Sequence, residues 1–197
     1  MLKRIFDLVV SSLSLCFFAP VIIIISIIIK LTSDGPIFYR GIRIGLNGKP
    51  FRIFKFRTMI VDAESKGGPS TALNDARLTS IGKFIRKYKL DELPQFINVL
   101  NGEMSIVGPR PQVEKYTKLY REEEKIILSV KPGLTDYSSI EFIDLDSILG
   151  DDNVDDKYLQ EIEPKKNILR IKYVKEHSLL IDMGIIAQTI GRILFKI

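Results

Sequence analysis

The chain has 197 residues, 46% of them hydrophobic and 27% charged, and a formal net charge of +5. This length and composition predict one folded domain, with or without an appended segment, and exclude a disordered or collagen-like chain. One cysteine and one histidine exclude a disulfide framework, cysteine-based zinc sites and His-rich metal sites, so an enzyme of this composition would work with carboxylates, lysines, arginines and backbone amides.

The charge is unevenly distributed along the chain. Residues 1–60 carry nine Lys and Arg against two Asp and Glu, a net charge of +7, whereas residues 141–163 carry one Lys against nine acids, a net charge of −8. A basic N-terminal third indicates a phosphate-bearing partner such as a membrane surface, a nucleotide or a nucleic acid. A solvated basic surface is the alternative.

The first predicted element is a long apolar helix. Residues 8–29 contain no charged side chain and would be about 33 Å long as a helix, enough to cross the hydrocarbon core of a membrane. Pro20 removes a hydrogen bond inside this helix and kinks it. Lys3 and Arg4 flank one end and Lys30 the other, so the positive-inside rule favours neither end for export. A kinked span and a re-entrant segment with both ends in the cytoplasm remain open.

A β-hairpin is predicted next. Residues 37–43 and 51–59 are rich in aromatic and β-branched residues, and the Asn-Gly dipeptide between them is the strongest short signal for a hairpin turn. Lys55 and Arg57 fall on one face of the second strand because side chains alternate. They are either a phosphate-facing pair or part of an exposed basic edge.

A short helix is predicted to begin at Asp91, a favourable N-cap residue, with Phe96, Ile97 and Leu100 as its buried stripe. A helix N-terminus lowers the pKa of a carboxyl group, so Asp91 is expected to be ionised. It could then act as a nucleophile or as a ligand of Mg²⁺, which usually shares its shell with substrate phosphates. A capped helix without a catalytic role is the alternative.

Two arginines flank this helix in the sequence. Arg86 belongs to a predicted helix over residues 79–89 and can neutralise phosphate oxygens. Arg110 follows Gly108 in a Gly-Pro-Arg-Pro turn, whose prolines reduce the entropy lost when the guanidinium binds an oxyanion. A solvated turn is the alternative for Arg110. The helix predicted over residues 79–89 is indicated by apolar residues at helical spacing: Ile81, Phe84, Ile85 and Tyr88.

The C-terminal third contains two further predicted features. Residues 179–197 form either an interfacial amphipathic helix or a core-packed terminal helix. The acidic run 144–156 is expected to be a solvated surface or a loop that selects a partner.

Four segments in this order resemble the bacterial sugar transferase family, the small monotopic phosphoglycosyl transferases: the Pro-broken apolar segment, FYRGIRIGLNGKPFRIFKFRTM, FIRKYKLDELPQFINVLNGEMSIVGPRP and KPGLT. The resemblance covers about residues 1–135. It implies transfer of a sugar-1-phosphate from a UDP-sugar to polyprenol (undecaprenyl) phosphate through a covalent aspartyl phosphosugar, with release of UMP. This is the first membrane step of surface glycan, O-antigen, capsule or glycoprotein glycan assembly.

The resemblance also implies partners and a location. The partners are the UDP-sugar, polyprenol phosphate, the membrane and other glycan-assembly enzymes, with no nucleic acid. The location is the cytoplasmic face of the bacterial inner membrane. The implied fold is α+β and mostly helical, with a re-entrant membrane helix-break-helix over residues 1–31 and a cytoplasmic catalytic domain over residues 32–197. That domain would contain the short hairpin and interfacial amphipathic helices.

Residue roles follow from the same resemblance. Asp91 is the implied nucleophile and Glu92 its partner, and Mg²⁺ is implied at Asp91 and Glu92. The implied phosphate-binding residues are Arg86, Arg110, Lys55, Arg57 and Gly108. The implied membrane break lies at Ala19 and Pro20, where the family often has Ser-Pro.

The sequence leaves the family pattern after Thr135. Many members continue there as Gly-Trp-Ala-Gln-Val-Asn-Gly-Arg, whereas this chain has Asp136-Tyr137-Ser138 and contains no tryptophan. The pocket beside the sugar is therefore expected to differ. The acidic segment 136–163 is expected to tune sugar recognition, with the polar loop 62–77 as the alternative location; a solvated acidic surface is also open. Its groups that can hydrogen-bond a sugar are Tyr137, Ser138, Ser139, Glu141 and Asp144.

Two other classes of function explain part of the pattern. A non-catalytic membrane-anchored protein that binds anionic lipid head groups would account for the basic third and the apolar segment, but not for adjacent acids between two arginines. A phosphohydrolase acting on phospholipids or nucleotides is the second alternative.

Overall fold

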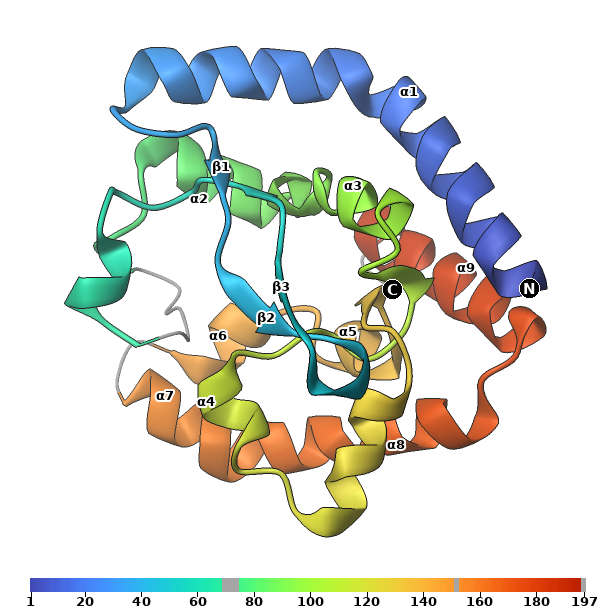
Figure 1. The fold of residues 1–197 in the computed structure, drawn as a ribbon. Helices are drawn as coiled ribbons and strands as arrows, with labels where there is room; N and C mark the ends of the chain where they lie inside the picture. Colours follow the sequence, from blue (N-terminus) through green and yellow to red (C-terminus); the bar gives the residue numbers. More distant parts are fainter. Residues whose placement is uncertain (69–74, 151–152, 196–197) are drawn as a thin grey trace.

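The structure is a computed structural model that describes residues 1–68, 75–150 and 153–195 (Figure 1). It confirms a mostly helical α+β fold. The helices are α1 (Leu2–Thr32), α2 (Ser80–Lys87), α3 (Gln95–Leu100), α4 (Glu114–Thr117), α5 (Tyr137–Glu141), α6 (Leu145–Leu149), α7 (Val154–Lys157), α8 (Glu163–Glu176) and α9 (Leu179–Phe195). The strands are β1 (Phe38–Tyr39), β2 (Ile42–Ile44), β3 (Pro50–Arg52), β4 (Lys55–Phe56), β5 (Ser105–Val107) and β6 (Gly133–Thr135).

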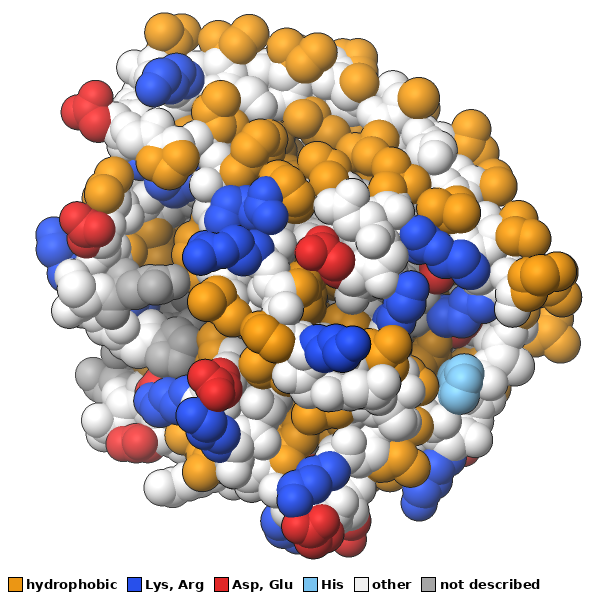
Figure 2. Space-filling model, viewed as in Figure 1, with side chains coloured by type: hydrophobic (Ala, Val, Ile, Leu, Met, Phe, Trp, Pro, Cys, Tyr) orange, Lys and Arg blue, Asp and Glu red, His pale blue; other side chains and the backbone are white. Residues whose placement is uncertain are grey.

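The long helix α1 runs along the outer edge of the molecule and is bent near its middle (Figure 1). Proline inside a helix removes a backbone hydrogen bond and clashes with the preceding turn, which is the usual cause of such a bend. The break expected at Ala19 and Pro20 therefore takes the form of a bend, and the helix continues through both residues. Among the described helices, α1 is long and apolar enough to cross a membrane. Its hydrophobic side chains cover the outer rim of the molecule (Figure 2).

Buried polar contacts fix the N-terminal arm of α1 to the rest of the chain. Asp7 is buried, and its Oδ1 accepts hydrogen bonds from the Ser105 hydroxyl and from the Ile106 backbone N–H, each at 3.0 Å. Lys3 forms an ion pair with the buried Asp182 of α9. Because each contact satisfies a group that is shielded from water, the arm is fixed in one register against β5.

Both ends of α1 are tied to the same folded unit. Near its start, the Arg4 guanidinium donates to the Leu100 carbonyl oxygen at the C-terminus of α3, at 2.9 Å, where the helix dipole favours a cation. Beyond its end, Arg57 donates to the Ser33 carbonyl oxygen at 3.0 Å and also to that of Asp34. Side chains of the folded unit therefore hold α1 near both of its ends.

The expected hairpin is present, but each predicted strand is divided into two short ones. β2 pairs antiparallel with β3, and β1 pairs antiparallel with β4. In the turn, Asn47 and Gly48 have φ values of 55° and 74°, the left-handed conformation that Asn-Gly favours. β5 pairs parallel with β6, so the segments that contain Gly-Pro-Arg-Pro and Lys-Pro-Gly-Leu-Thr lie side by side.

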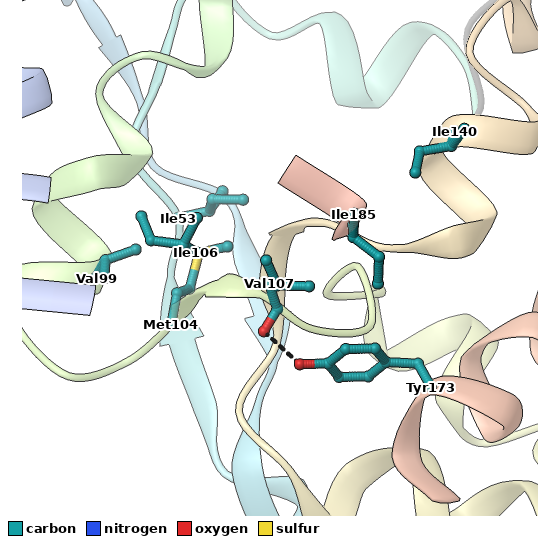
Figure 3. Close-up of a cluster of buried hydrophobic side chains, with 8 residues drawn as sticks. All are labelled: Ile53, Val99, Met104, Ile106, Val107, Ile140, Tyr173 and Ile185. Carbon is teal, nitrogen blue, oxygen red and sulfur yellow. Dashed lines mark hydrogen bonds between the residues drawn. The ribbon is translucent and has the colours of Figure 1, made fainter. Parts of the chain in front are cut away.

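The main hydrophobic core joins these strands to α3, α5, α8 and α9 (Figure 3). The Tyr173 hydroxyl donates to the Val107 carbonyl oxygen at 3.0 Å, which satisfies a polar group inside this core. The buried residues of the core are Ile53, Val99, Met104, Ile106, Val107, Ile140, Tyr173 and Ile185.

Helix α9 has the amphipathic character expected for residues 179–197, of which 196–197 lie outside the described residues. Ile185 and Asp182 on one face are buried in the core. The opposite face exposes large apolar side chains at Leu180, Met183, Ile190, Ile193 and Phe195. The two alternatives are therefore compatible, because one face packs on the core while the other is open to an apolar surface.

The burial of α2 and α3 differs from what apolar spacing suggests. In α2, Ile85 is buried, but Phe84 and Tyr88 are more than half exposed and contact each other with tilted rings, whose centroids lie 5.0 Å apart. In α3 the buried residues are Gln95, Asn98 and Val99 instead of Phe96, Ile97 and Leu100. Polar contacts explain this second difference, because the Asn98 side chain accepts from the Phe54 N–H at 2.7 Å and donates to the Arg52 carbonyl oxygen at 2.9 Å.

We expect Asp7→Ala to destabilise the protein by about 3 kcal/mol or more, because it removes a buried carboxylate and leaves two donors without a partner. In thermal unfolding of detergent-solubilised protein, this loss corresponds to a Tm lower by about 6 °C or more. The control is Asp34→Ala, which changes an exposed aspartate at the other end of α1 and should leave Tm nearly unchanged. Equal Tm values for the two variants would contradict the anchoring role of Asp7.

Candidate active site

Asp91 and Glu92 lie in a tight 3-10 turn, Leu90–Glu92, between α2 and α3. Lys89 precedes this turn with a φ of 55° in the left-handed region, which ends α2 and redirects the chain. The prediction that Asp91 caps the following helix is wrong, because α3 begins only at Gln95. The Asp91 carboxylate is instead buried, with 7% of the residue exposed.

Two cations from distant parts of the chain hold Glu92. Its Oε1 accepts from Lys55 Nζ and its Oε2 accepts from Arg110 Nη1, each at 2.8 Å. Arg110 Nη2 donates a second bond to Oε1, so the contact is bidentate and charge-assisted. Lys55 Nζ also lies 3.6 Å from Asp91 Oδ2. The structure therefore brings four of the predicted site residues into one cluster.

The two adjacent carboxyl groups have opposite electrostatic environments. Burial raises the pKa of Asp91, and the charge of Glu92 adds to the rise against the opposing effect of Lys55. Burial acts on Glu92 in the same direction, but Arg110 and Lys55 outweigh it and hold the pKa of Glu92 well below its usual range. The expected lowering of the Asp91 pKa by a helix N-terminus is thus wrong. Neighbouring carboxyl groups with diverging pKa values are typical of residues with different catalytic roles.

A pocket of about 180 Å³ lies beside this cluster. One part of its wall is apolar and aromatic, and includes Tyr116, Leu145, Leu149 and Tyr158. The basic side chains that line it are Arg43, Lys55, Arg86, Arg110 and Lys166. Five cations around one small pocket are suited to a substrate with several phosphate charges.

Two predicted phosphate-binding residues, Arg57 and Gly108, form hydrogen bonds with other parts of the chain. The Arg57 guanidinium donates to the chain just after α1, so the structure does not place it beside Lys55 at the carboxylates. The Gly108 N–H donates to the Thr135 carbonyl oxygen at 3.0 Å and is therefore not free for phosphate. A Cβ at Gly108 would lie 2.4 Å from the Lys131 carbonyl oxygen, so this glycine is needed for close packing of two loops.

A divalent cation has a limited set of protein ligands here. Within the described residues no group of three His, Cys, Asp or Glu side chains could hold a metal ion. Both oxygens of Glu92 are engaged by Lys55 and Arg110, which argues against its expected role as a metal ligand. Asp91 remains as a single carboxylate. That donor set fits Mg²⁺, which commonly binds through one or two carboxylates together with substrate phosphates and water.

In segment 136–163, the side chains that line the pocket are not the hydroxyls expected to bind a sugar. Residues 151–152 of this segment lie outside the described residues. The Ser138 and Ser139 hydroxyls donate to the Asp136 carboxylate at 2.7–2.9 Å, and this carboxylate also accepts from the Ser139 N–H at the start of α5. These hydroxyls are therefore used within the helix cap. The segment reaches the pocket through Leu145, Leu149 and Tyr158. The polar loop 62–77 holds a 3-10 turn over Ala63–Lys66, and its residues 69–74 lie outside the described residues.

The sequence analysis missed Lys166 as a residue of the pocket. A signal for it existed, because Ile162, Lys166, Arg170 and Tyr173 fall on one face of a helix at the spacing of a buried stripe. All four are buried in the structure. Charged residues at core positions of an otherwise amphipathic helix are unusual and indicate a specific partner or ligand.

Comparison with known proteins shows which family the chain belongs to. The pattern that defines the family described as bacterial sugar transferase matches residues 1–196. The chain is 37% identical over 193 residues to a UDP-glucose:undecaprenyl-phosphate glucose-1-phosphate transferase of Escherichia coli (strain K12), covering 96% of this chain and 39% of that protein. It is 37% identical over 193 residues to the uncharacterized sugar transferase EpsL of Bacillus subtilis (strain 168), covering 98% of this chain and 87% of that protein.

A third relative is a UDP-N-acetylgalactosamine-undecaprenyl-phosphate N-acetylgalactosaminephosphotransferase of Aeromonas hydrophila, which is 33% identical over 196 residues. The match covers 98% of this chain and 44% of that protein. The chain thus spans less than half the length of the first and third of these relatives. The family pattern and the three alignments cover nearly the whole chain, which therefore belongs to the bacterial sugar transferase family.

Proposed function

We propose that the protein transfers a sugar-1-phosphate from a UDP-sugar to polyprenol phosphate and releases UMP. The observation that carries this proposal is the environment of the Asp91–Glu92 pair. Glu92 is fixed by Lys55 and Arg110, whereas Asp91 is buried with a raised pKa and fewer contacts. The names of the relatives support the two substrate classes. A protein that only binds anionic lipids would not need this arrangement.

The reaction divides into two displacements at phosphorus. In the first, a carboxylate oxygen of Asp91 attacks the phosphorus that carries the sugar, the bond between the two phosphates breaks, and UMP leaves. In the second, an oxygen of polyprenol phosphate attacks the same phosphorus, the bond to Asp91 breaks, and polyprenyl diphosphate sugar forms. Two steps allow a water-soluble and a lipid substrate to use the site in turn.

The basic residues of the pocket would stabilise the charge that moves between oxygens. Arg86 and Arg110 line the pocket beside the carboxylates. Lys55 Nζ contacts both the Asp91 and the Glu92 carboxylate. Fixed cations are the main source of catalysis in phosphoryl transfer. Mg²⁺, held by Asp91 together with substrate phosphates and water, would neutralise part of the diphosphate charge. Glu92 would act as a positioning residue by keeping Lys55 and Arg110 in place.

We propose further that α1 is a re-entrant segment, with residues 1–31 inserted in the cytoplasmic membrane and residues 32–197 on its cytoplasmic face. The supporting observation is that both ends of α1 contact the same folded unit, through Arg4 at one end and Arg57 at the other. A helix that crossed the whole membrane would place its ends about 30 Å apart across the hydrocarbon core. The exposed apolar face of α9 would then lie at the membrane interface.

We expect Asp91→Asn to reduce transfer by at least about a thousandfold, because the amide is a poor nucleophile. With UDP-sugar alone, the intact mass of wild-type protein should rise by one sugar phosphate, and that of the variant should not change. Asp34→Asn, which changes an exposed aspartate just after α1 that does not line the pocket, is the matched control. Residual polyprenol-dependent UMP release within tenfold of wild type would rule out Asp91 as the nucleophile.

The two arginines that the resemblance placed at phosphate should behave differently. We expect Arg110→Met to lower kcat/KM for the donor by roughly a hundredfold or more, because it removes a fixed cation from the pocket. Arg57→Met should lower Tm, because it frees the end of α1, and should leave kcat/KM within about threefold of wild type at a temperature where the protein is folded. A hundredfold loss of kcat/KM in folded Arg57→Met protein would instead indicate that Arg57 acts on the substrate.

Cysteine labelling in whole cells tests the topology. In a Cys16→Ser background, Leu2→Cys and Asp34→Cys place one thiol at each end of α1. A membrane-impermeant thiol reagent should label neither position in intact cells and both positions after permeabilisation. Labelling of one position from outside would establish a full span, in conflict with the contacts at both ends of α1.

A further inference from the structure

Lys166 is a buried cation of the pocket to which the proposed mechanism gives no role. It lies on α8 and is 5% exposed, although its side chain lines the same pocket as Arg110 and Lys55. Its neighbour Lys165 is exposed to solvent. The fold therefore directs one lysine of this pair into the pocket and the other into water.

The surroundings of Lys166 offer aromatic rings instead of a carboxylate. Its Nζ lies 5.5 Å from the ring centroids of Phe142 and Tyr158. Two acids face it, but Glu163 is paired with Arg170 at 2.8 Å, and the Asp136 carboxylate accepts from serines of its own helix cap. In the described part of the chain, no acidic residue forms an ion pair with Lys166.

An ammonium group in this position is poorly compensated. Burial, together with the positive charges of Arg170 and Arg110, lowers the pKa of Lys166 to about 7, and the negative charges of Asp136 and Glu163 only partly oppose this. A buried cation without an anion costs free energy, and an anion that enters the pocket would remove that cost. A phosphate group is the natural candidate, because the pocket is lined by four other cations.

We propose that Lys166 binds a phosphate oxygen of the nucleotide diphosphate donor, on the side of the pocket remote from α1. This inference rests on the proposed function. Polyprenol phosphate offers the same chemistry, but it would approach from the membrane. Figure 1 shows α8 on the side of the molecule opposite to α1, and α8 has no substantial contact with that helix. The soluble donor is therefore the substrate expected to reach Lys166.

The test compares Lys166→Met with Lys166→Arg, and uses Lys165→Met as the matched control. Lys166→Met should weaken UDP binding, measured by titration calorimetry, and raise the donor KM, each by roughly tenfold or more, because a charge-assisted contact with phosphate is lost. The KM for polyprenol phosphate should stay within about twofold of wild type. Lys166→Arg should restore most of the donor affinity, and Lys165→Met should change none of these values.

A pH series gives a second measurement that does not need the methionine variant to fold. The donor KM of wild type should rise as the pH increases from 7 to 8.5, because the charged form of Lys166 is lost above its pKa. Lys166→Arg should abolish this rise, since arginine stays charged. The charged and titratable groups that face Lys166 are Arg170, Arg110, Glu163, Asp136 and Tyr158. Nearby acids raise the pKa values of Arg170 and Arg110, so both stay charged over this range, and burial raises the pKa of Tyr158, so its hydroxyl stays neutral.

Several results would overturn the proposal. An unchanged donor KM in folded Lys166→Met protein would exclude the contact, and so would the same pH dependence in wild type and Lys166→Arg. A rise in the KM for polyprenol phosphate alone would assign Lys166 to the acceptor. Wild-type protein that releases no UMP from any UDP-sugar in a panel would instead refute the proposed function, while the UDP titrations would still decide whether Lys166 binds phosphate.

Discussion

The site depends on the two ion pairs that Glu92 forms with Lys55 and Arg110. Lys55 comes from β4, Arg110 from the turn after β5, and Glu92 from the 3-10 turn before α3, so one carboxylate joins three segments that are distant in the sequence. Both cations outweigh the cost of burying this acid, whereas the adjacent Asp91 is buried with less compensation. Glu92 is thereby fixed in place, and Asp91 is left with a raised pKa, as the nucleophile role proposed for it would require.

Helix α1 and the candidate site are built on the same short elements. Asp7 holds β5, and the chain leaves β5 directly into the turn that carries Arg110. Arg4 holds the end of α3, whose start follows the turn that carries Asp91. The Asp7 contacts are buried and the Arg4 contacts are partly buried. Because these groups have hydrogen-bond partners, a shift of α1 would be transmitted to both sides of the site. In the proposed reaction, this rigid connection would fix the Asp91 carboxylate relative to α1.

The pocket separates two kinds of interaction. Its cations can hold phosphate, while Tyr116, Leu145, Leu149 and Tyr158 supply an apolar and aromatic wall. Three of these four residues come from segment 136–163, which begins with Asp136-Tyr137-Ser138 in place of the motif that many members of the family carry there, although the family pattern matches residues 1–196. That segment therefore remains a candidate for donor specificity, although it reaches the pocket with side chains other than the predicted hydroxyls.

The sequence by itself determined the apolar bent helix, the hairpin turn and four residues of the charged cluster, Asp91, Glu92, Lys55 and Arg110. These features depend on local signals: hydrophobic length, Asn-Gly, and charged residues beside proline and glycine. Tertiary structure alone decided which partner each of these charged side chains has. Lys55 and Arg57 alternate correctly for one strand face, yet the strand is divided and Arg57 caps the end of α1. The pKa of Asp91 follows burial, which no local pattern reveals, and Lys166 differs from Lys165 only in the direction in which packing of α8 turns it.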